Sequence, residues 1–125
     1  MQDFDAAAVE AEIRAAFDAY EVALMANDVT ALVDAFRVDP RTVRLTPEGG
    51  AWGHDEVAAF RKARDPGDIT RDLLRVEIQA LSADAGVASA SYRRRGSGRT
   101  GAQTQVWRRF PEGWRIVAAQ VALAS

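Results

Sequence analysis

The sequence predicts an α+β fold in which a curved antiparallel sheet wraps around three helices and forms a cone with an internal pocket. Three observations predict it. The first third of the chain repeats apolar residues at helical spacing, the last half alternates apolar and polar residues, and short glycine-containing turns divide that half into strands. Residues 1–125 should form one domain, because a chain of this length rarely divides.

Two helices are expected at the start of the chain. The first runs from Ala6 to Ala26, and Tyr20 lies on its apolar stripe, so the Tyr20 ring should face the core. The buried hydroxyl then needs a partner, of which a backbone carbonyl is the ordinary one. Asn27-Asp28 should cap a second helix, which ends before Asp39-Pro40 because a residue that precedes proline avoids the helical region.

Residues 39–53 should form a small hairpin around a turn at 47–50. The first strand alternates, which places Arg44 on the face opposite its apolar neighbours. An arginine in this position is unusual, so we expect Arg44 to point into a pocket and bind an anion there. The alternative is an edge-strand arginine paired with Glu48 or Asp55.

A third helix should run from His54 to Arg64, with Arg61 and Arg64 on one face because they are three residues apart. An antiparallel meander should follow, with Leu74 on an inner face and Trp107 among the exposed aromatic residues. Its strands are expected within 69–81, 87–95, 100–110 and 114–123.

Composition excludes several classes of function. The net charge of −2 and the pI of about 5.4 disfavour a nucleic-acid partner. There is no cysteine, and His54 is the only histidine, so neither a metal nor another cofactor is expected. No apolar run is long enough to cross a membrane, and the acidic N-terminus does not resemble a signal peptide. We therefore expect a soluble, cytoplasmic protein.

Several runs along the chain resemble one family in their order and spacing. They are Ala16-Phe17 with Tyr20-Glu21 and Ala23-Leu24, Asn27-Asp28, Asp39-Pro40-Arg41-Thr42-Val43-Arg44, Ala59-Phe60-Arg61 with Ala63-Arg64, Gly101 with Gln103, Gln105 and Trp107, and Gly113-Trp114-Arg115-Ile116-Val117-Ala118-Ala119. Together they resemble the AtzH-like family, within the cystatin-like cone shared by ketosteroid isomerase, the nuclear transport factors and the polyketide cyclases. That cone hosts enzymes and non-enzymes alike.

The resemblance implies a role in nitrogen catabolism. Members of the family accompany amidases of cyanuric acid and oxalurate breakdown. AtzH is a decarboxylating amidohydrolase that converts 1,3-dicarboxyurea to allophanate, and its key tyrosine and arginine correspond to Tyr20 and Arg44. The sequence departs from the family pattern at Ala102, where the family has arginine, at Gln120, where it has histidine, and at 45–47, where a glycine is usual.

The chemistry of a small dianion assigns roles to these side chains. Arg44 can hold a carboxylate through two parallel hydrogen bonds, and Arg61 and Arg64 are candidates for a second carboxylate. The alternative for that pair is a solvated helix face. If they face the cavity, three glutamines on adjacent strands can bind the carbonyl and amide groups, namely Gln103, Gln105 and Gln120. A face of these strands can instead be solvated or lie at a dimer interface.

Loss of carbon dioxide from an N-carboxylate requires protonation of the nitrogen, and a buried Tyr20 hydroxyl can deliver that proton. A neighbouring Arg44 would favour the phenolate that remains. No serine, threonine or aspartate nucleophile has an evident base beside it, so water attacking a polarised substrate is the remaining hydrolytic route. His54 is expected as a surface or capping residue.

Two other functions compete with the enzyme hypothesis. One is a non-catalytic subunit that binds or stabilises an amidase. The other is a polyketide cyclase or isomerase-like enzyme, which needs a larger apolar cavity with a carboxylate base. The expected partners are a small anionic substrate, a second copy in a homodimer and, for the first of these alternatives, an amidase subunit.

Overall fold

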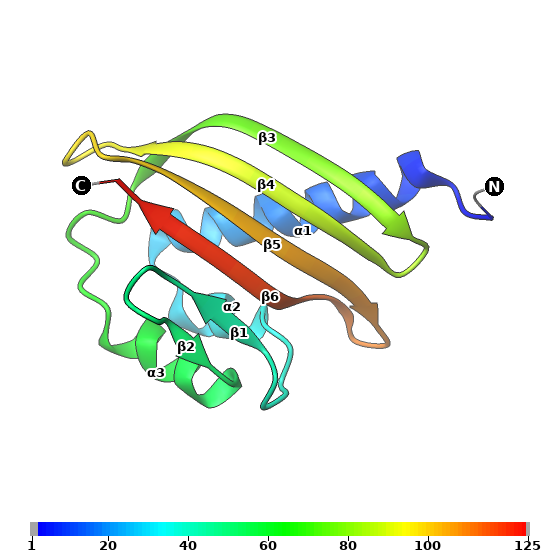
Figure 1. The fold of residues 1–125 in the computed structure, drawn as a ribbon, viewed down its shortest axis with the longest axis horizontal. Coiled ribbons are helices and arrows are strands. Elements are labelled where there is room, and N and C mark those ends of the chain that lie inside the picture. The colour runs from blue at the N-terminus through cyan, green and yellow to red at the C-terminus, as the bar shows by residue number, and fades with distance from the viewer. Residues whose placement is uncertain (1–2, 125) are drawn as a thin grey trace.

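The computed structural model describes residues 3–124, which form three helices under one curved six-stranded sheet (Figure 1). The predicted fold class is confirmed. Helix α1 crosses beneath β3 and β4, α3 packs against the β1–β2 hairpin, and α2 packs against both α1 and α3. The helices are α1 (Ala6–Ala26), α2 (Val29–Asp34) and α3 (His54–Ala63), and the strands are β1 (Val43–Leu45), β2 (Ala51–Trp52), β3 (Arg71–Ser82), β4 (Ala85–Arg94), β5 (Thr100–Phe110) and β6 (Gly113–Leu123).

The sheet order β2-β1-β6-β5-β4-β3 places the small hairpin beside the last strand. Strands β3 to β6 form the antiparallel meander that the alternation predicts. Strand β1 pairs with β6 in parallel, with Arg44 opposite Ala119. Because residues opposite each other share a face, this pairing turns Arg44 toward the concave side, on which the buried Ala119 lies.

Helix α1 supplies both apolar and charged groups to the interior. Asp5 caps it by accepting a hydrogen bond from the Ala8 N–H, and Asn27 ends it in a left-handed conformation. Its buried residues include the predicted Tyr20 and also Glu21. Glu21 tolerates burial because Arg71 donates to both of its carboxylate oxygens, from Nε to Oε2 at 3.1 Å and from Nη2 to Oε1.

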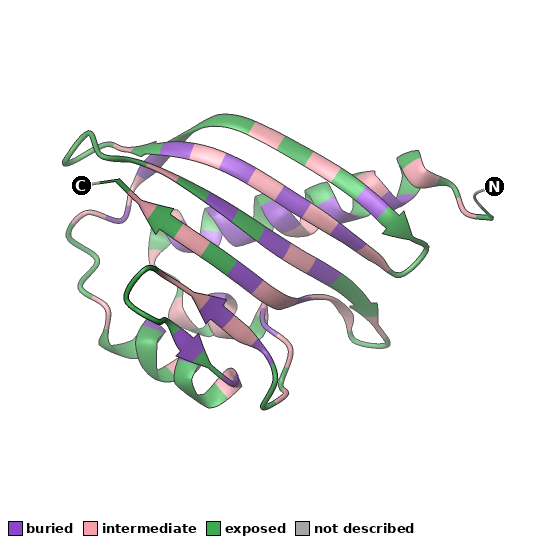
Figure 2. Ribbon diagram, in the orientation of Figure 1, coloured by how far each residue is buried: buried purple, intermediate pink, exposed green. Residues whose placement is uncertain are grey.

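Two sheet positions differ from the sequence predictions. Leu74 is 52% exposed, because a register shift between Leu73 and Arg75 breaks the alternation there. Trp107 is buried, not exposed, since its ring meets the Tyr20 ring edge-on with 6.4 Å between centroids. Buried positions otherwise alternate with intermediate ones along β4, and with exposed or intermediate ones along the middle of β5 (Figure 2).

Helix α3 begins where the sequence predicts and ends slightly earlier. Arg64 is extended and ends the helix one residue earlier than expected. His54 lies at the first turn, as predicted, where its Nε2 is 3.2 Å from the Val33 carbonyl oxygen.

Among residues 3–124, no helix is both long and apolar enough to cross a membrane.

Candidate functional site

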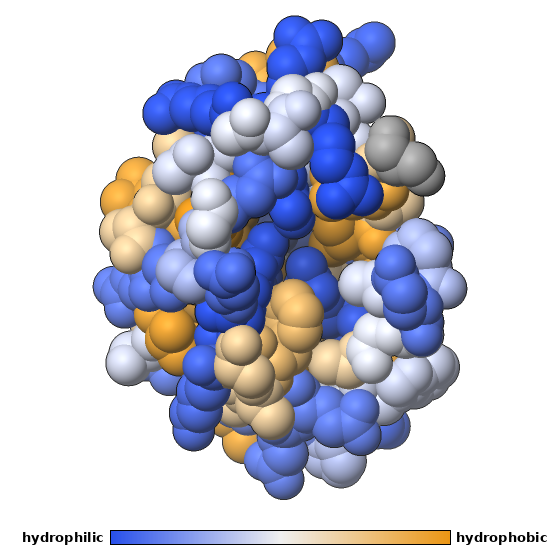
Figure 3. All heavy atoms as spheres, turned by 90° about the vertical axis from the view of Figure 1, so that its left-hand side faces the viewer, coloured by the Kyte–Doolittle hydropathy of each residue, from blue (hydrophilic) through white to orange (hydrophobic). Residues whose placement is uncertain are grey.

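A narrow inner chamber lies between the concave face of the sheet, α1 and α3. Its volume is about 20 Å³, and it shares Arg44, Arg64, Tyr92, Arg94 and Val121 with an outer chamber of about 470 Å³. The remaining inner lining is Tyr20, Leu24, Phe36, Arg61, Arg71, Gln103, Gln105 and Ala119. At the end of the molecule that carries the β4–β5 turn, a hollow opens between hydrophilic and apolar side chains (Figure 3).

Tyr20 and Arg61 meet in this chamber. Arg61 donates a hydrogen bond from Nη2 to the Tyr20 hydroxyl oxygen. A guanidinium group cannot accept a hydrogen bond, so the Tyr20 oxygen is the acceptor and its own proton is free for another partner. The aromatic rings of Phe36 and Trp107 pack edge-on against Tyr20 and hold its ring in place. Tyr20 is therefore oriented to offer a proton to a ligand.

Arg61 keeps two further donors inside the protein. The residue is 2% exposed, and its Nε and Nη1 have no hydrogen-bond partner among the described residues. An unmet buried donor costs about 1–3 kcal/mol. The sequence left Arg61 as either a second carboxylate ligand or part of a solvated helix face, whereas the structure buries it as the partner of Tyr20.

Arg44 points into the chamber, as the alternation predicts. It is buried, its guanidinium lies 4.4 Å from the centroid of the Phe60 ring, and it pairs with neither Glu48 nor Asp55. Burial, and after it the charge of Arg61, lowers the pKa of Arg44 to about 10. Arg44 thus stays charged at neutral pH and gains from any anion placed beside it.

The chamber holds more positive than negative charge. Arg71 is neutralised by Glu21, and Arg94 lies 3.6 Å from Asp68, whereas Arg44, Arg61 and Arg64 have no ion-pair partner within residues 3–124. Burial and then the charges of Arg61 and Arg94 lower the pKa of Arg64 to about 10. Such an excess of guanidinium groups in a buried site favours a ligand with two negative charges.

The glutamines of β5 line the chamber, and protein donors hold their side-chain oxygens. Gln103 Oε1 accepts from Arg71 Nη2 at 2.9 Å, and Gln105 Oε1 accepts from Trp107 Nε1 at 3.0 Å. These bonds fix the amide orientation, because the oxygen of each side chain is the atom that faces a protein donor. The buried Gln103 Nε2 has no partner among the described residues and can therefore bind a ligand acceptor.

Three further residues of the chamber were not predicted, namely Arg71, Tyr92 and Arg94. Arg71 and Arg94 lie opposite each other in β3 and β4, and Tyr92 fits over Gly101 of β5. A Cβ atom on Gly101 would lie 2.5 Å from the Tyr92 hydroxyl oxygen, so Tyr92 requires glycine there. Extending the strand alternation from Gln103 across the meander would have placed all three on the concave face.

Gln120 and Ala102 lie outside the chamber. Gln120 is exposed and pairs with Thr104, and Ala102 is exposed and pairs with Ala122, all on the convex face. Gln120 therefore does not join Gln103 and Gln105. It follows that the departures from the family pattern at 102 and 120 leave the lining of the inner chamber unchanged.

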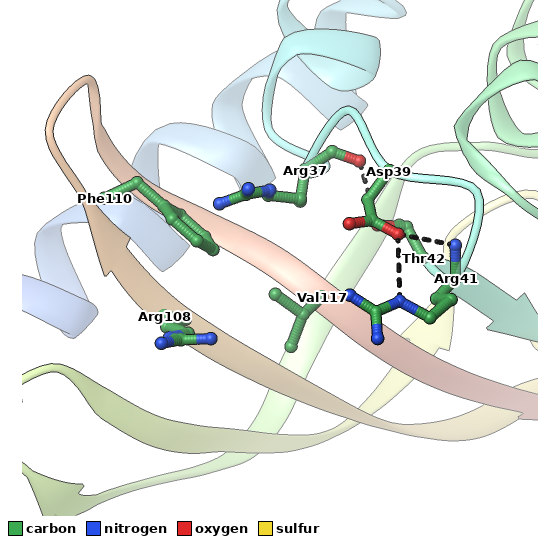
Figure 4. A pocket seen from close by; sticks show the side chains of 7 residues that line it. All are labelled: Arg37, Asp39, Arg41, Thr42, Arg108, Phe110 and Val117. Carbon is green, nitrogen blue, oxygen red and sulfur yellow. Dashed lines mark hydrogen bonds and ion pairs between the residues drawn. The ribbon is translucent and has the colours of Figure 1, made fainter.

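A second hollow of about 380 Å³ lies between the α2–β1 loop and the ends of β5 and β6. Arg37 stacks on the Phe110 ring at 3.8 Å and Arg108 lies 5.4 Å from it, while Arg41 bonds Asp39 (Figure 4). The backbone and side chain of Arg41 lower the pKa of Asp39. None of the described residues lines both this hollow and the Tyr20 chamber.

Comparison with known proteins agrees with this architecture. The model of the AtzH-like family matches residues 2–125. The chain belongs to the AtzH-like family. A search of the curated proteins gives no match.

Solved structures of other proteins share the fold of this AtzH-like chain. A protein of unknown function of the DUF3225 family from Pectobacterium atrosepticum is 44% identical, with a TM-score of 0.89 over 95% of this chain and 93% of that chain. A cystatin-like fold protein from Burkholderia xenovorans is 33% identical, with a TM-score of 0.86 over 94% and 92%. An NTF2-like superfamily protein from Salmonella enterica is 26% identical, with a TM-score of 0.75 over 95% and 93%.

Proposed function

We propose that the protein is a small-molecule amidohydrolase that removes a carboxylate from an N-carboxylated urea or a related dianion, as in the conversion of 1,3-dicarboxyurea to allophanate. The observation that supports it most is the Arg61–Tyr20 hydrogen bond beside arginines that have no carboxylate partner among residues 3–124. A proton donor and a site for a dianion then occupy one buried chamber.

The proposed reaction needs no protein nucleophile. The bond between the urea nitrogen and the carboxylate carbon breaks, its electron pair stays on nitrogen, and carbon dioxide leaves. The nitrogen takes the Tyr20 proton, and water then reprotonates the tyrosinate and leaves hydroxide. Arg61 stabilises the tyrosinate through the hydrogen bond that it already donates.

The same side chains that would bind the dianion also favour its decarboxylation. Arg44 and Arg64 are the available partners for the carboxylates, and Gln103 Nε2 can donate to the central carbonyl oxygen. Transfer of a carboxylate from water into a dry chamber also favours loss of its charge. In this proposal Arg61 and Arg64 have different roles. Arg61 donates its hydrogen bond to Tyr20, and Arg64 binds a carboxylate of the substrate.

The test is an assay of the purified protein on 1,3-dicarboxyurea generated in the reaction, beside allophanate and oxalurate, with detection of carbon dioxide and of the organic product. We expect carbon dioxide and allophanate from 1,3-dicarboxyurea above the spontaneous rate. Failure to accelerate the loss of carbon dioxide from any of the three would contradict the proposal.

A second candidate function is a binding or stabilising subunit for an amidase. The second hollow favours it, because Arg37 and Arg108 flank Phe110 in an open site that an acidic segment of a partner would fit. This candidate predicts a complex with the amidase that an Arg37→Glu, Arg108→Glu double variant abolishes, and no turnover by the protein alone. The homodimer stays a prediction. Sedimentation velocity would measure the oligomeric state.

The cyclase alternative fits the chamber less well. Such an enzyme needs a carboxylate base and room for a ring system, whereas the described residues that line the inner chamber include neither aspartate nor glutamate. The inner volume of about 20 Å³ excludes a ring system, and a small dianion would extend from it into the outer chamber of about 470 Å³. The small dianion therefore remains the better supported ligand.

A further inference from the structure

The inner chamber offers many hydrogen-bond donors and few free acceptors. Gln103 Oε1 and Gln105 Oε1 each accept a bond from a protein donor, and the Tyr20 oxygen accepts from Arg61. In contrast, Arg61 Nε, Arg61 Nη1 and Gln103 Nε2 are buried donors with no partner among the described residues. The best ligand for this lining is one whose polar atoms are all acceptors.

A urea does not fully meet this requirement. Its carboxylates and carbonyl accept hydrogen bonds, but each of its N–H groups must face a lining that is rich in donors. Buried donors without acceptors lower affinity. If each N–H of 1,3-dicarboxyurea is replaced by CH₂, the result is 3-oxopentanedioate, which keeps two carboxylates and a central carbonyl in the same order and has no donor.

We propose that the chamber also binds 3-oxo dicarboxylates and decarboxylates them. This inference rests on the acid role of Tyr20 in the proposed function. The bond between a carboxylate carbon and the adjacent CH₂ breaks, and its electron pair forms an enolate while carbon dioxide leaves. The enolate carbon takes the Tyr20 proton to give acetoacetate, and water returns that proton and leaves hydroxide. Gln103 Nε2 and the free Arg61 donors bind the enolate oxygen.

Two positioning residues, Glu21 and Arg71, fix the orientation of the Gln103 side-chain amide. Glu21 holds Arg71 through two hydrogen bonds, and Arg71 in turn holds Gln103 Oε1. The amide donor therefore cannot exchange places with the oxygen without breaking a buried contact. This arrangement favours a carbonyl oxygen over CH₂ at the centre of the ligand.

The test follows conversion of 3-oxopentanedioate to acetoacetate by proton NMR, with the spontaneous rate subtracted. We expect acceleration by the wild type and by the control Gln79→Leu, whose side chain is exposed on the opposite face of the sheet. Gln103→Leu should lose at least about tenfold in kcat/KM, as expected for a lost hydrogen bond to developing charge. Gln103→Glu, which keeps the acceptor for Arg71, should show the same loss and separates the donor role from folding.

Calorimetric titration supplies a second readout. Pentanedioate, which has the same length without the carbonyl, should bind the wild type more weakly than 3-oxopentanedioate, and Gln103→Glu should abolish the difference. No acceleration, or equal rates in the wild type and Gln103→Glu, would overturn the inference. Activity on 1,3-dicarboxyurea alone would refute only this inference, and activity on 3-oxopentanedioate alone would refute only the proposed function.

Discussion

Arg61 on α3 donates a hydrogen bond to the hydroxyl of Tyr20 on α1, across 41 positions of sequence. The bond places a cation against the oxygen of a buried acid and leaves the acidic proton free. Arg44 shares the same chamber and has no carboxylate partner in the described part of the chain. The pair of Tyr20 and Arg44 that the sequence predicts is therefore completed by a third residue.

Replacing Arg44 should lower the catalytic efficiency on the substrate. We expect Arg44→Ala to lower kcat/KM for the N-carboxylated urea by about 10- to 100-fold, because a charge-assisted contact to a carboxylate is lost. Arg44→Lys should recover only part of this, since lysine cannot make the two parallel bonds. Steady-state kinetics measures the effect, with the exposed Arg75→Ala as the matched control. Equal losses in both alanine variants would argue against a specific role.

Anion binding should depend on pH in the alkaline range. Burial lowers the pKa of Arg44 and of Arg64 to about 10, so both are protonated below that value and lose their charge as the pH rises through it. The affinity for pentanedioate should be constant between about pH 7 and 9 and fall above about pH 10. Calorimetric titration across this range measures it, and constant affinity to about pH 11 would contradict these two pKa values.

The Glu21–Arg71 pair should be important for folding. Both side chains are buried, so Glu21→Gln leaves an uncompensated guanidinium, and we expect a loss of about 3–5 kcal/mol in the free energy of unfolding. Urea denaturation measures it. Glu77→Gln, in the exposed pair with Arg75, should change stability little. If the two variants were equally stable, the buried pair would not have the structural role assigned to it.

Restoring the family residues at two positions should have no effect on catalysis. Ala102 and Gln120 are exposed on the convex face, so Ala102→Arg and Gln120→His should leave kcat and KM within about twofold of the wild type. The same assay on the double variant tests this. A change in substrate preference would show that these positions reach the chamber.

Local sequence patterns predict the parts of the site that depend on periodicity. Helical spacing turns Tyr20 inward, and strand alternation turns Arg44, Gln103 and Gln105 to one face. Pairing between distant elements is not encoded in such spacing. The parallel contact of β1 with β6 and the approach of Arg61 to Tyr20 both arise from tertiary packing.

Two errors have specific physical causes. The register shift after Leu73 breaks a strict alternation and leaves Leu74 exposed. Gln120 was grouped with the β5 glutamines because the three lie at near-even spacings on adjacent strands, but its cross-strand partner is Thr104, on the opposite face. Glu21 was missed as a site residue because its partner, Arg71, is 50 residues away in the sequence.

The central claim is that Tyr20 supplies the proton for loss of carbon dioxide in an arginine-lined chamber. The most direct measurement compares the rate of carbon dioxide release from 1,3-dicarboxyurea by the wild type and by Tyr20→Phe at saturating substrate. Phenylalanine keeps the ring that packs against Phe36 and Trp107, so binding should persist while kcat falls by about 10²- to 10⁴-fold. A kcat in Tyr20→Phe equal to that of the wild type would contradict the claim.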